Sequence, residues 1–245
     1  MRRRAFVCLA CQAVAGAAIA QPHPEFGYSG AQGPGNWGSM SEHWRTCSAG
    51  VNQSPIDLGR FIEATLPPLR ISYGPSGRDV THTGHAIQVN AGPGSTLEVD
   101  GLTFRLLQFH FHAPGEHHLE GRAFPLEAHL VHQNEAGELA VIGVFFEVGA
   151  PNDLLVLVIP SLPAGPGQQR PLGSGLTPAG LLPADRDYIR YAGSLTTPPC
   201  SEGVRWLVMK RPMTASSAQI AALSDALGFA NNRPTQPIRA RPVLR

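Results

Sequence analysis

The chain has 245 residues, a length within the range of one large β-rich domain. Hydrophobic residues make up 42% and charged residues 15%, which supplies enough apolar side chains for a substantial core. The formal net charge of +1 gives no reason to expect a nucleic acid or an anionic membrane as a partner. We find no internal repeat and no block of like charges.

The first twenty residues have the pattern of an export signal. Residues 2–4 are three arginines, and residues 5–20 are uncharged and mostly apolar. Ala-Ile-Ala at 18–20 fits the small-x-small cleavage rule, so we predict a signal peptide at 1–20 and a mature chain from Gln21. The stretch is short for a membrane span, and no span is expected in the mature chain. A periplasmic or secreted protein is therefore expected, with an uncleaved anchor as the alternative.

Removal of this signal leaves two of the four cysteines, Cys47 and Cys200. An exported chain with two cysteines most simply forms one disulfide. Closing so long a loop could stabilise the fold by up to about 5 kcal/mol on chain-entropy grounds. Zinc ligation is the alternative, but the pair lacks CxxC spacing and better ligands are available.

The segment 21–49 shows no sustained period and predicts an irregular region packed on the core through Trp37 and Trp44. Asp100-Gly101 is a two-residue hairpin signal between two strand candidates. The strands expected in this half of the chain are 69–73, 81–89, 95–99 and 102–106.

Two further segments place histidines at strand spacing. Gln108, His110 and His112 alternate with phenylalanines, so they share one face of a strand, and Glu127 and His129 share a face of the next. If the strands pair antiparallel, three imidazoles converge, which is the ligand set of a catalytic zinc that activates water. With 10 histidines, chance alone gives about 0.4 His-x-His pairs, so the pair gains its weight from this context.

The remaining chain completes a β-rich pattern. The apolar run 139–148 predicts a strand buried on both faces, and 160–183, crowded with Pro and Gly, predicts a long loop. Residues 204–210 form a strand candidate, and 216–227 is an amphipathic helix. The expected fold is mostly β (α+β): a single domain around a large, mostly antiparallel twisted sheet with a few short peripheral helices.

Several segments, in order along nearly the whole mature chain, together resemble the α-class carbonic anhydrases. They are Gly27-Tyr28 with Trp37-Gly38, Gln53-Ser54-Pro55-Ile56, Gly84-His85-Ala86, Gln108 to His112, Gly115-Glu116-His117, Glu127 to His132, Gly193 to Pro199, and Arg233-Pro234 with Gln236-Pro237. The Cys47–Cys200 pair resembles the disulfide of exported bacterial members. The resemblance implies that residues 21–245 form one catalytic domain, a zinc-dependent lyase that reversibly hydrates CO₂ to bicarbonate and a proton.

The resemblance also implies roles around the metal. His110, His112 and His129 would hold Zn²⁺, and zinc-bound hydroxide would attack CO₂. Gln108 would accept the second N–H of His110, and Glu127 that of His129. A backbone carbonyl near residue 231 would do the same for His112.

Thr196 and Glu116 resemble the family's gatekeeping pair, in which the threonine hydroxyl donates to the carboxylate and orients the attacking oxygen. The Thr196 backbone N–H would bind a substrate oxygen, and Thr197 would line the site. His85 matches the proton shuttle, whereas His82 is expected to be an ordinary surface residue. The residues that match the apolar wall for CO₂ are Val131, Val141, Leu195, Val204 and Trp206. The alternative is that they are ordinary core residues.

Phe26 and Thr83 depart from the family pattern, and two further histidines are assigned no role at the metal. Phe26 stands where many members have Trp, and Thr83 where Asn is common near the shuttle. His117 matches a buried structural histidine, and His132 would face away from the metal on a regular strand.

Two other functions stay open from the sequence. One is a zinc hydrolase acting on esters, which a comparison of CO₂ and ester turnover would separate. The other is a non-catalytic surface binding protein on the same fold, which absence of bound zinc would favour. A homodimer is also left open.

Overall fold

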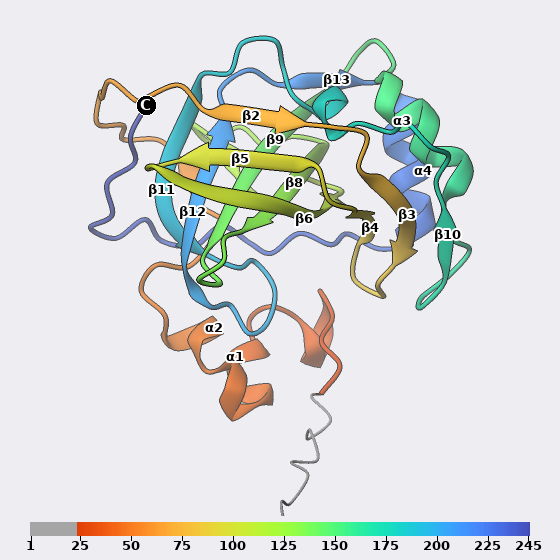
Figure 1. The fold of residues 1–245 in the computed structure, drawn as a ribbon. Coiled ribbons are helices and arrows are strands. Elements are labelled where there is room, and N and C mark those ends of the chain that lie inside the picture. The colour runs from red at the N-terminus through yellow and green to blue at the C-terminus, as the bar shows by residue number, and fades with distance from the viewer. Residues whose placement is uncertain (1–23) are drawn as a thin grey trace, which may run out of the picture.

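The computed structural model describes residues 24–245, so the predicted signal peptide lies outside the described residues. An eleven-stranded sheet has the order β10-β3-β4-β6-β8-β9-β12-β11, with β2 and β5 joined through β6 and β13 through β9 (Figure 1). Neighbouring strands are antiparallel except where β9 meets β12 and β13. The predicted fold class, a large and mostly antiparallel sheet with few short helices, is confirmed.

The strands have the following bounds: β1 Asp57–Leu58, β2 Arg70–Tyr73, β3 Gly77–His82, β4 Ile87–Ala91, β5 Ser95–Val99, β6 Leu102–His112, β7 His118–Leu119, β8 Leu126–Gln133, β9 Leu139–Val148, β10 Gln169–Pro171, β11 Tyr188–Ser194, β12 Glu202–Met209 and β13 Met213–Ala215. The α-helices are α1 Trp37–Met40, α2 Thr46–Ala49, α3 Asp153–Val158 and α4 Ser217–Leu227. The 3₁₀ helices are η1 Gly30–Gln32, η2 Glu42–Trp44, η3 Ile159–Ser161 and η4 Pro178–Leu181. No helix among the described residues is both long enough and apolar enough to span a membrane.

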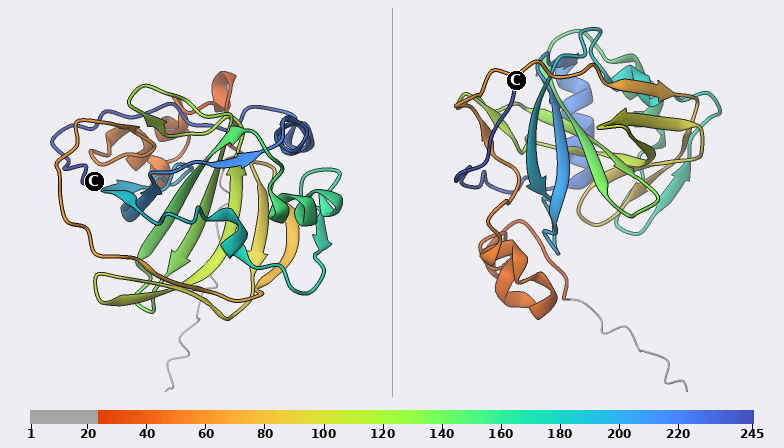
Figure 2. Two further views of the ribbon diagram at one scale, coloured as in Figure 1. Left: turned by 90° about the horizontal axis from the view of Figure 1, so that it is seen from above. Right: turned by 60° about the vertical axis from the view of Figure 1, so that its left-hand side comes forward.

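The helices lie outside the sheet. Figure 2 shows α1 and α2 together at one end of the molecule, and its right-hand view shows α4 behind the strands. A disulfide joins Cys47 in α2 to Cys200, which follows β11, across 153 residues of sequence. The predicted pairing of the two cysteines is thereby confirmed.

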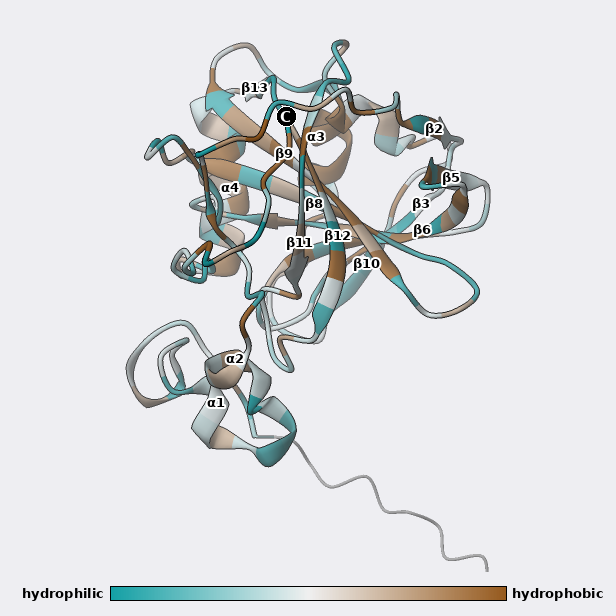
Figure 3. Cartoon of the chain, turned by 90° about the vertical axis from the view of Figure 1, so that its left-hand side faces the viewer, coloured by the Kyte–Doolittle hydropathy of each residue, from teal (hydrophilic) through white to brown (hydrophobic). Residues whose placement is uncertain are grey.

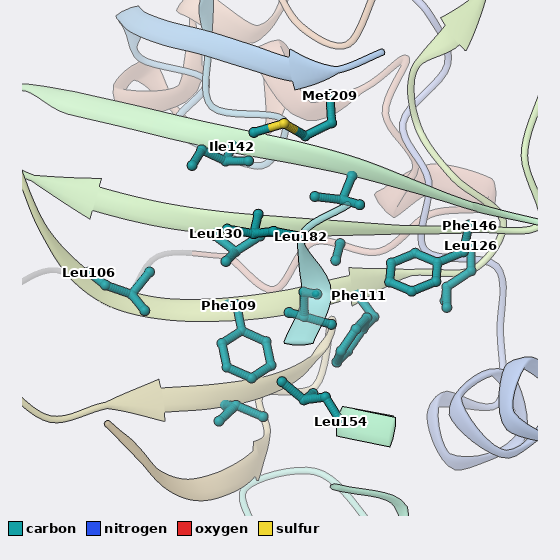
Figure 4. Close-up of a cluster of buried hydrophobic side chains, with 14 of the residues drawn as sticks. Leu106, Phe109, Phe111, Leu126, Leu130, Ile142, Phe146, Leu154, Leu182 and Met209 are labelled. Carbon is teal, nitrogen blue, oxygen red and sulfur yellow. The ribbon is translucent and has the colours of Figure 1, made fainter. Parts of the chain in front are cut away.

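The period-2 pattern of β6 puts its phenylalanines in the main core. Phe109 is 0% and Phe111 3% exposed, and Figure 4 shows them among Leu130, Leu154 and Leu182. Burying a side chain of this size contributes about 1.5–3 kcal/mol, which pins the register of the strand. Figure 3 shows hydrophobic residues concentrated along the strands that build this core.

Three elements predicted from local sequence patterns are present in the structure. Asp100 (φ +56°) and Gly101 (φ +73°) form the turn between β5 and β6, as the hairpin signal predicts. The apolar run 139–148 is β9, buried through most of its length. Helix α4 begins after Ser216, whose hydroxyl forms a capping box with Gln219.

The single strand predicted at 81–89 is wrong, because the segment contains a turn between β3 and β4. The Thr83 hydroxyl accepts the backbone N–H groups of His85 and Ala86 at 3.2 and 3.0 Å. Gly84 takes φ +91°, a conformation that favours glycine. This turn places His85 at the ends of β3 and β4.

Two regions predicted to be irregular contain short elements. The loop 160–183 includes β10, which pairs with β3, and helices η3 and η4. All three residues of β10 are exposed, so no hydrophobic alternation marks it in the sequence. The described part of 21–49 holds four short helices, with Trp37 and Trp44 buried as expected.

Candidate metal centre and active site

Three imidazoles converge on one point on the face of the sheet opposite the phenylalanines. His110 and His112 project from β6, and the register pairs His110 with His129 of β8. Ring centroids are 5.0 Å apart for His110 and His112, 5.4 Å for His110 and His129, and 4.5 Å for His112 and His129. One ring nitrogen from each lies within 4.8 Å of the others. The structure therefore brings together the triad that the sequence predicts.

The other ring nitrogen of each histidine has a hydrogen-bond acceptor. His110 Nδ1 lies 2.9 Å from Gln108 Oε1, and His129 Nε2 lies 2.8 Å from Glu127 Oε1. His112 Nδ1 lies 2.8 Å from the main-chain oxygen of Asn231. These acceptors fix which nitrogen carries the proton, leaving the inward nitrogens free as ligands.

Two buried polar atoms at the centre have no hydrogen-bond partner among the described residues. They are His112 Nε2 and Glu116 Oε2, which lie 3.5 Å apart. Buried polar atoms are rarely left unpaired, so each such atom calls for an explanation. Three inward-facing imidazole nitrogens beside a buried carboxylate suit a divalent cation, and this donor set fits Zn²⁺.

Burial favours the neutral form of two of the three imidazoles. Burial, reinforced by the neighbouring imidazoles, lowers the pKa of His110 well below its usual range. Burial also lowers the pKa of His112, although Glu116 partly offsets this. Burial would lower the pKa of His129 too, but the adjacent Glu127 outweighs it and raises that pKa. Neutral imidazoles are the form that binds metals, so the shifts of His110 and His112 favour binding, whereas a cation must displace the proton that the raised pKa of His129 retains.

Glu127 is a buried hub of four hydrogen bonds. Its Oε1 accepts from His117 Nδ1 at 2.7 Å and from His129 Nε2 at 2.8 Å. Its Oε2 accepts the backbone N–H groups of Glu116 and His117, both at 2.8 Å. Burial would raise the pKa of this carboxyl, yet the two histidines hold it well below its usual range. Because these groups already bond one another, we do not count His117, Glu127 and His129 as a second metal site.

Glu116 and Thr196 are both buried, at 1% and 6% exposure. Glu116 Oε1 accepts the backbone N–H of Arg233 at 2.8 Å, and Oε2 has no partner among the described residues. No hydrogen bond joins the Thr196 hydroxyl to Glu116 in the part of the chain that the structure describes. Their gatekeeping role therefore stays a prediction.

The five predicted wall residues belong to one apolar cluster beside the histidines. Val131, Val141, Val204 and Trp206 are buried, and the partly buried Leu195 packs against them. The Trp206 ring lies 4.8 Å from the His129 ring. The half-buried Thr197 follows Thr196 in the loop after β11.

His85 lines a cavity of about 610 Å³ together with Tyr28, Thr83 and Phe229. Its imidazole stacks on Phe26, with ring centroids 3.7 Å apart and planes inclined by 15°. Burial lowers the pKa of His85, an effect that Glu25 partly offsets.

The prediction that His82 is a surface residue is wrong. His82 is 2% exposed, and its Nδ1 accepts the backbone N–H of Gly84 at 3.1 Å. The His82 N–H donates to the main-chain oxygen of Gln168, and the His82 C=O accepts the N–H of Gly167. No local sequence pattern reveals these contacts. His132 points away from the metal centre, as expected, and its Nε2 lies 2.6 Å from the Tyr73 hydroxyl.

Residues 32–245 match the family model described as eukaryotic-type carbonic anhydrase. The chain belongs to the carbonic anhydrase family. A carbonic anhydrase of Pectobacterium carotovorum is 43% identical over 219 residues, covering 89% of this chain and 90% of that protein. One of Neisseria gonorrhoeae is 43% identical over 244 residues, covering 99% and 96%. The α-carbonic anhydrase of Thermovibrio ammonificans, solved with the inhibitor sulfanilamide, superimposes with TM-score 0.89 at 47% identity, covering 90% and 99%. The chain is accordingly an enzyme of this family.

Sequence reasoning gave no role to several residues of this carbonic anhydrase site. The Tyr191 hydroxyl lies 2.6 Å from His117 Nε2 and 2.8 Å from Ser54 Oγ, extending the network behind Glu127. The Tyr28 hydroxyl is buried without a partner among the described residues, and burial raises its pKa, with Glu116 adding to the effect. Tyr28 and Ser54 lie in segments that carry the family resemblance. Their place in those segments was the sequence signal that could have pointed to a role.

Proposed function

We propose that this enzyme is a zinc-dependent carbonic anhydrase that interconverts CO₂ with bicarbonate and a proton. The observation that carries the proposal is the convergence of three imidazole nitrogens beside the unpaired Glu116 Oε2. Each imidazole has an acceptor on its outer nitrogen, which is the arrangement expected of metal-binding histidines.

His110, His112 and His129 would hold the metal. Zn²⁺ bound there supplies a nucleophile at neutral pH, because it lowers the pKa of bound water to about 7. Gln108 and Glu127 orient the rings of His110 and His129. The ionised Glu127 also makes the His129 imidazole a stronger donor to a cation.

Thr196 and Glu116 would orient the attacking oxygen. Glu116 Oε1 accepts the Arg233 N–H, whereas Oε2 has no partner among the described residues, so Oε2 is the oxygen that we expect to accept from the Thr196 hydroxyl. The Thr196 oxygen is then left to accept a hydrogen bond from the nucleophile and aim its lone pair at carbon. The Thr196 N–H would bind a substrate oxygen, with Thr197 alongside.

CO₂ offers no strong hydrogen-bonding group, so its binding surface should be apolar. The wall of Val131, Val141, Leu195, Val204 and Trp206 supports this requirement, because its Trp206 ring lies beside the His129 ring. His85, which is partly exposed and lines a cavity, would take the proton released at the metal and pass it to buffer.

We further propose export, with residues 1–20 removed and 21–245 forming the catalytic domain. The Cys47–Cys200 disulfide supports an oxidising compartment, the periplasm or beyond. Mass spectrometry of protein recovered from the periplasm or the medium would test this. An intact mass beginning at Met1 would contradict it.

Stopped-flow CO₂ hydration by the purified protein, before and after zinc chelation, tests the main proposal. We expect fast hydration that disappears with the metal and returns when Zn²⁺ is added. A folded, zinc-loaded protein that does not hydrate CO₂ would overturn the reaction. Turnover of esters by that protein would point to a zinc hydrolase, and failure to bind zinc would point to a non-catalytic binding protein.

A further inference from the structure

Asn231 is fully buried, at 0% exposure, and every polar atom of its side chain is bonded. Its Oδ1 accepts the backbone N–H of Ala113 at 2.9 Å. Its Nδ2 donates to the backbone oxygens of Phe111, at 2.9 Å, and His85, at 3.1 Å. Its own main-chain oxygen receives His112 Nδ1 at 2.8 Å. One residue thus contacts both the metal-binding strand and the turn that carries His85.

The amide of Asn231 completes the sheet at the end of β6. It bonds the C=O before His112 and the N–H after it, as a residue of an adjacent parallel strand would do. Strand β4 begins at Ile87, opposite Phe111, and supplies no partner beyond that point. The Asn231 side chain therefore holds the main chain on both sides of His112.

The third bond of this amide reaches the turn between β3 and β4. That turn is short, and the Thr83 hydroxyl already fixes its interior through the N–H groups of His85 and Ala86. The His85 carbonyl is the point at which Asn231 ties this preformed turn to β6. A rigid turn held at one end in this way has a defined position relative to His112.

The segment that bears Asn231 is itself anchored. The Arg233 guanidinium, 1% exposed, donates to Gln53 Oε1 at 2.9 Å and to the backbone oxygens of Ser54 and Cys47 at 2.7 and 2.8 Å. The Arg233 N–H bonds Glu116. Asn231 thus connects the turn to a support that is fixed independently of β6.

We propose that Asn231 is a positioning residue that sets the place of His85 relative to the metal centre. The inference rests on the proposed role of His85 as proton acceptor. Transfer between held groups depends steeply on their separation, since a misplacement of about 1 Å can cost about 10²-fold in rate. The main-chain carbonyl that serves His112 survives any substitution, so the side chain can be changed without deleting that acceptor.

The test compares Asn231→Ala and Asn231→Asp with the wild-type holoenzyme in CO₂ hydration. Asn231→Asp keeps an oxygen for Ala113 but puts a second oxygen against the Phe111 and His85 carbonyls. For both variants we expect kcat in weak buffer to fall by about fivefold or more, because proton export is impaired. We expect kcat/KM to fall by less than kcat, since the Asn231 side chain also holds the main chain beside His112. Added imidazole should restore kcat. A kcat unchanged in weak buffer, or a joint loss of kcat and kcat/KM without rescue, would overturn the proposal.

Two controls separate positioning from plain stability. Asn152 is also buried, at 5% exposure, and caps α3 through Leu154 and Leu155. Asn152→Ala should lower the melting temperature without changing the response to buffer. In a His85→Ala background, Asn231→Ala should reduce kcat no further, because the two changes act on one step. Additive losses would contradict the inference.

The design also distinguishes this inference from the proposed function. If the wild-type holoenzyme does not hydrate CO₂, the function fails. If it does, and His85→Ala shows the buffer-dependent loss while folded Asn231 variants do not, only the role of Asn231 fails. Should Asn231→Ala not fold, the near-isosteric Asn231→Asp decides the matter by the same kinetic comparison.

Discussion

Glu127 Oε1 lies 2.8 Å from Nε2 of His129, two residues further along the same strand. The carboxylate is buried and ionised, because His117 and His129 hold its pKa well below the usual range against the effect of burial. It therefore presents a full negative charge to a histidine that would bind the metal. Loss of that charge should weaken metal binding even though the three histidine ligands are unchanged.

Glu127→Gln should lower the affinity for Zn²⁺ by about 10–100-fold, the usual cost of losing such an outer partner. An amide oxygen carries no net charge, and the amide nitrogen cannot accept the two backbone N–H groups that Oε2 now receives. Competition with a chelator measures the affinity. Glu138→Gln, at an exposed turn, is the matched control. Equal affinities for the Glu127 variant and wild type would contradict the expectation.

His129→Ala should abolish both zinc binding and CO₂ hydration, because two imidazoles do not hold a structural or catalytic zinc well. Metal content after dialysis and stopped-flow hydration check the two effects. His118→Ala is the comparison, since His118 is partly exposed on β7 and has no place in the proposed site. Retention of zinc and activity by His129→Ala would refute the ligand assignment.

His85→Ala should slow hydration in weak buffer and be rescued by imidazole. His85 is only partly buried, so its side chain can exchange protons with solvent. We expect the loss to fall within the about 10²–10⁴-fold range of general acid–base groups, and to be smaller where buffer itself accepts protons. Rates across a series of buffer concentrations are the measurement. A rate independent of buffer in both proteins would mean that another group moves the proton.

His132 should make folding stability depend on pH. Burial lowers its pKa to about 4, despite the opposing effect of the carbonyls of Ala140 and Leu130. The folded protein keeps the ring neutral, with Nδ1 donating to Ala140 and Nε2 accepting from the Tyr73 hydroxyl. The unfolded chain, with a His pKa near 6.5, binds the proton more readily.

Because the unfolded chain binds the proton more readily, the free energy of unfolding falls as the pH falls. The contribution of the neutral His132 to the free energy of unfolding is fully present above about pH 6.5. It is lost as the pH falls towards 4, by up to about 3 kcal/mol. Urea unfolding at several pH values, compared between wild type and His132→Asn, measures it. We expect the gap between the two proteins to shrink as the pH falls. Parallel curves would show that His132 does not titrate in the folded state as expected.

The sequence by itself determined the features that rest on local patterns. The alternation of β6 and the apolar run of β9 define their faces, since side chains alternate along a strand. The turn at Asp100-Gly101 follows from the backbone preferences of its two residues, and the helix at 216–227 from the spacing of its apolar residues. The spacing of His110 and His112 likewise put two nitrogens on one face before any pairing was known.

Only the tertiary structure decided which distant groups meet those residues. His112 and Asn231 are 119 positions apart, and Glu116 and Arg233 are 117 apart. No local period links such positions, because their contact depends on how the C-terminal segment crosses the sheet. The same holds for β10, which pairs through its backbone alone, and for His82, which is buried by a loop some eighty-five residues away. Side-chain spacing selects the face of a strand, whereas long-range packing selects what that face meets.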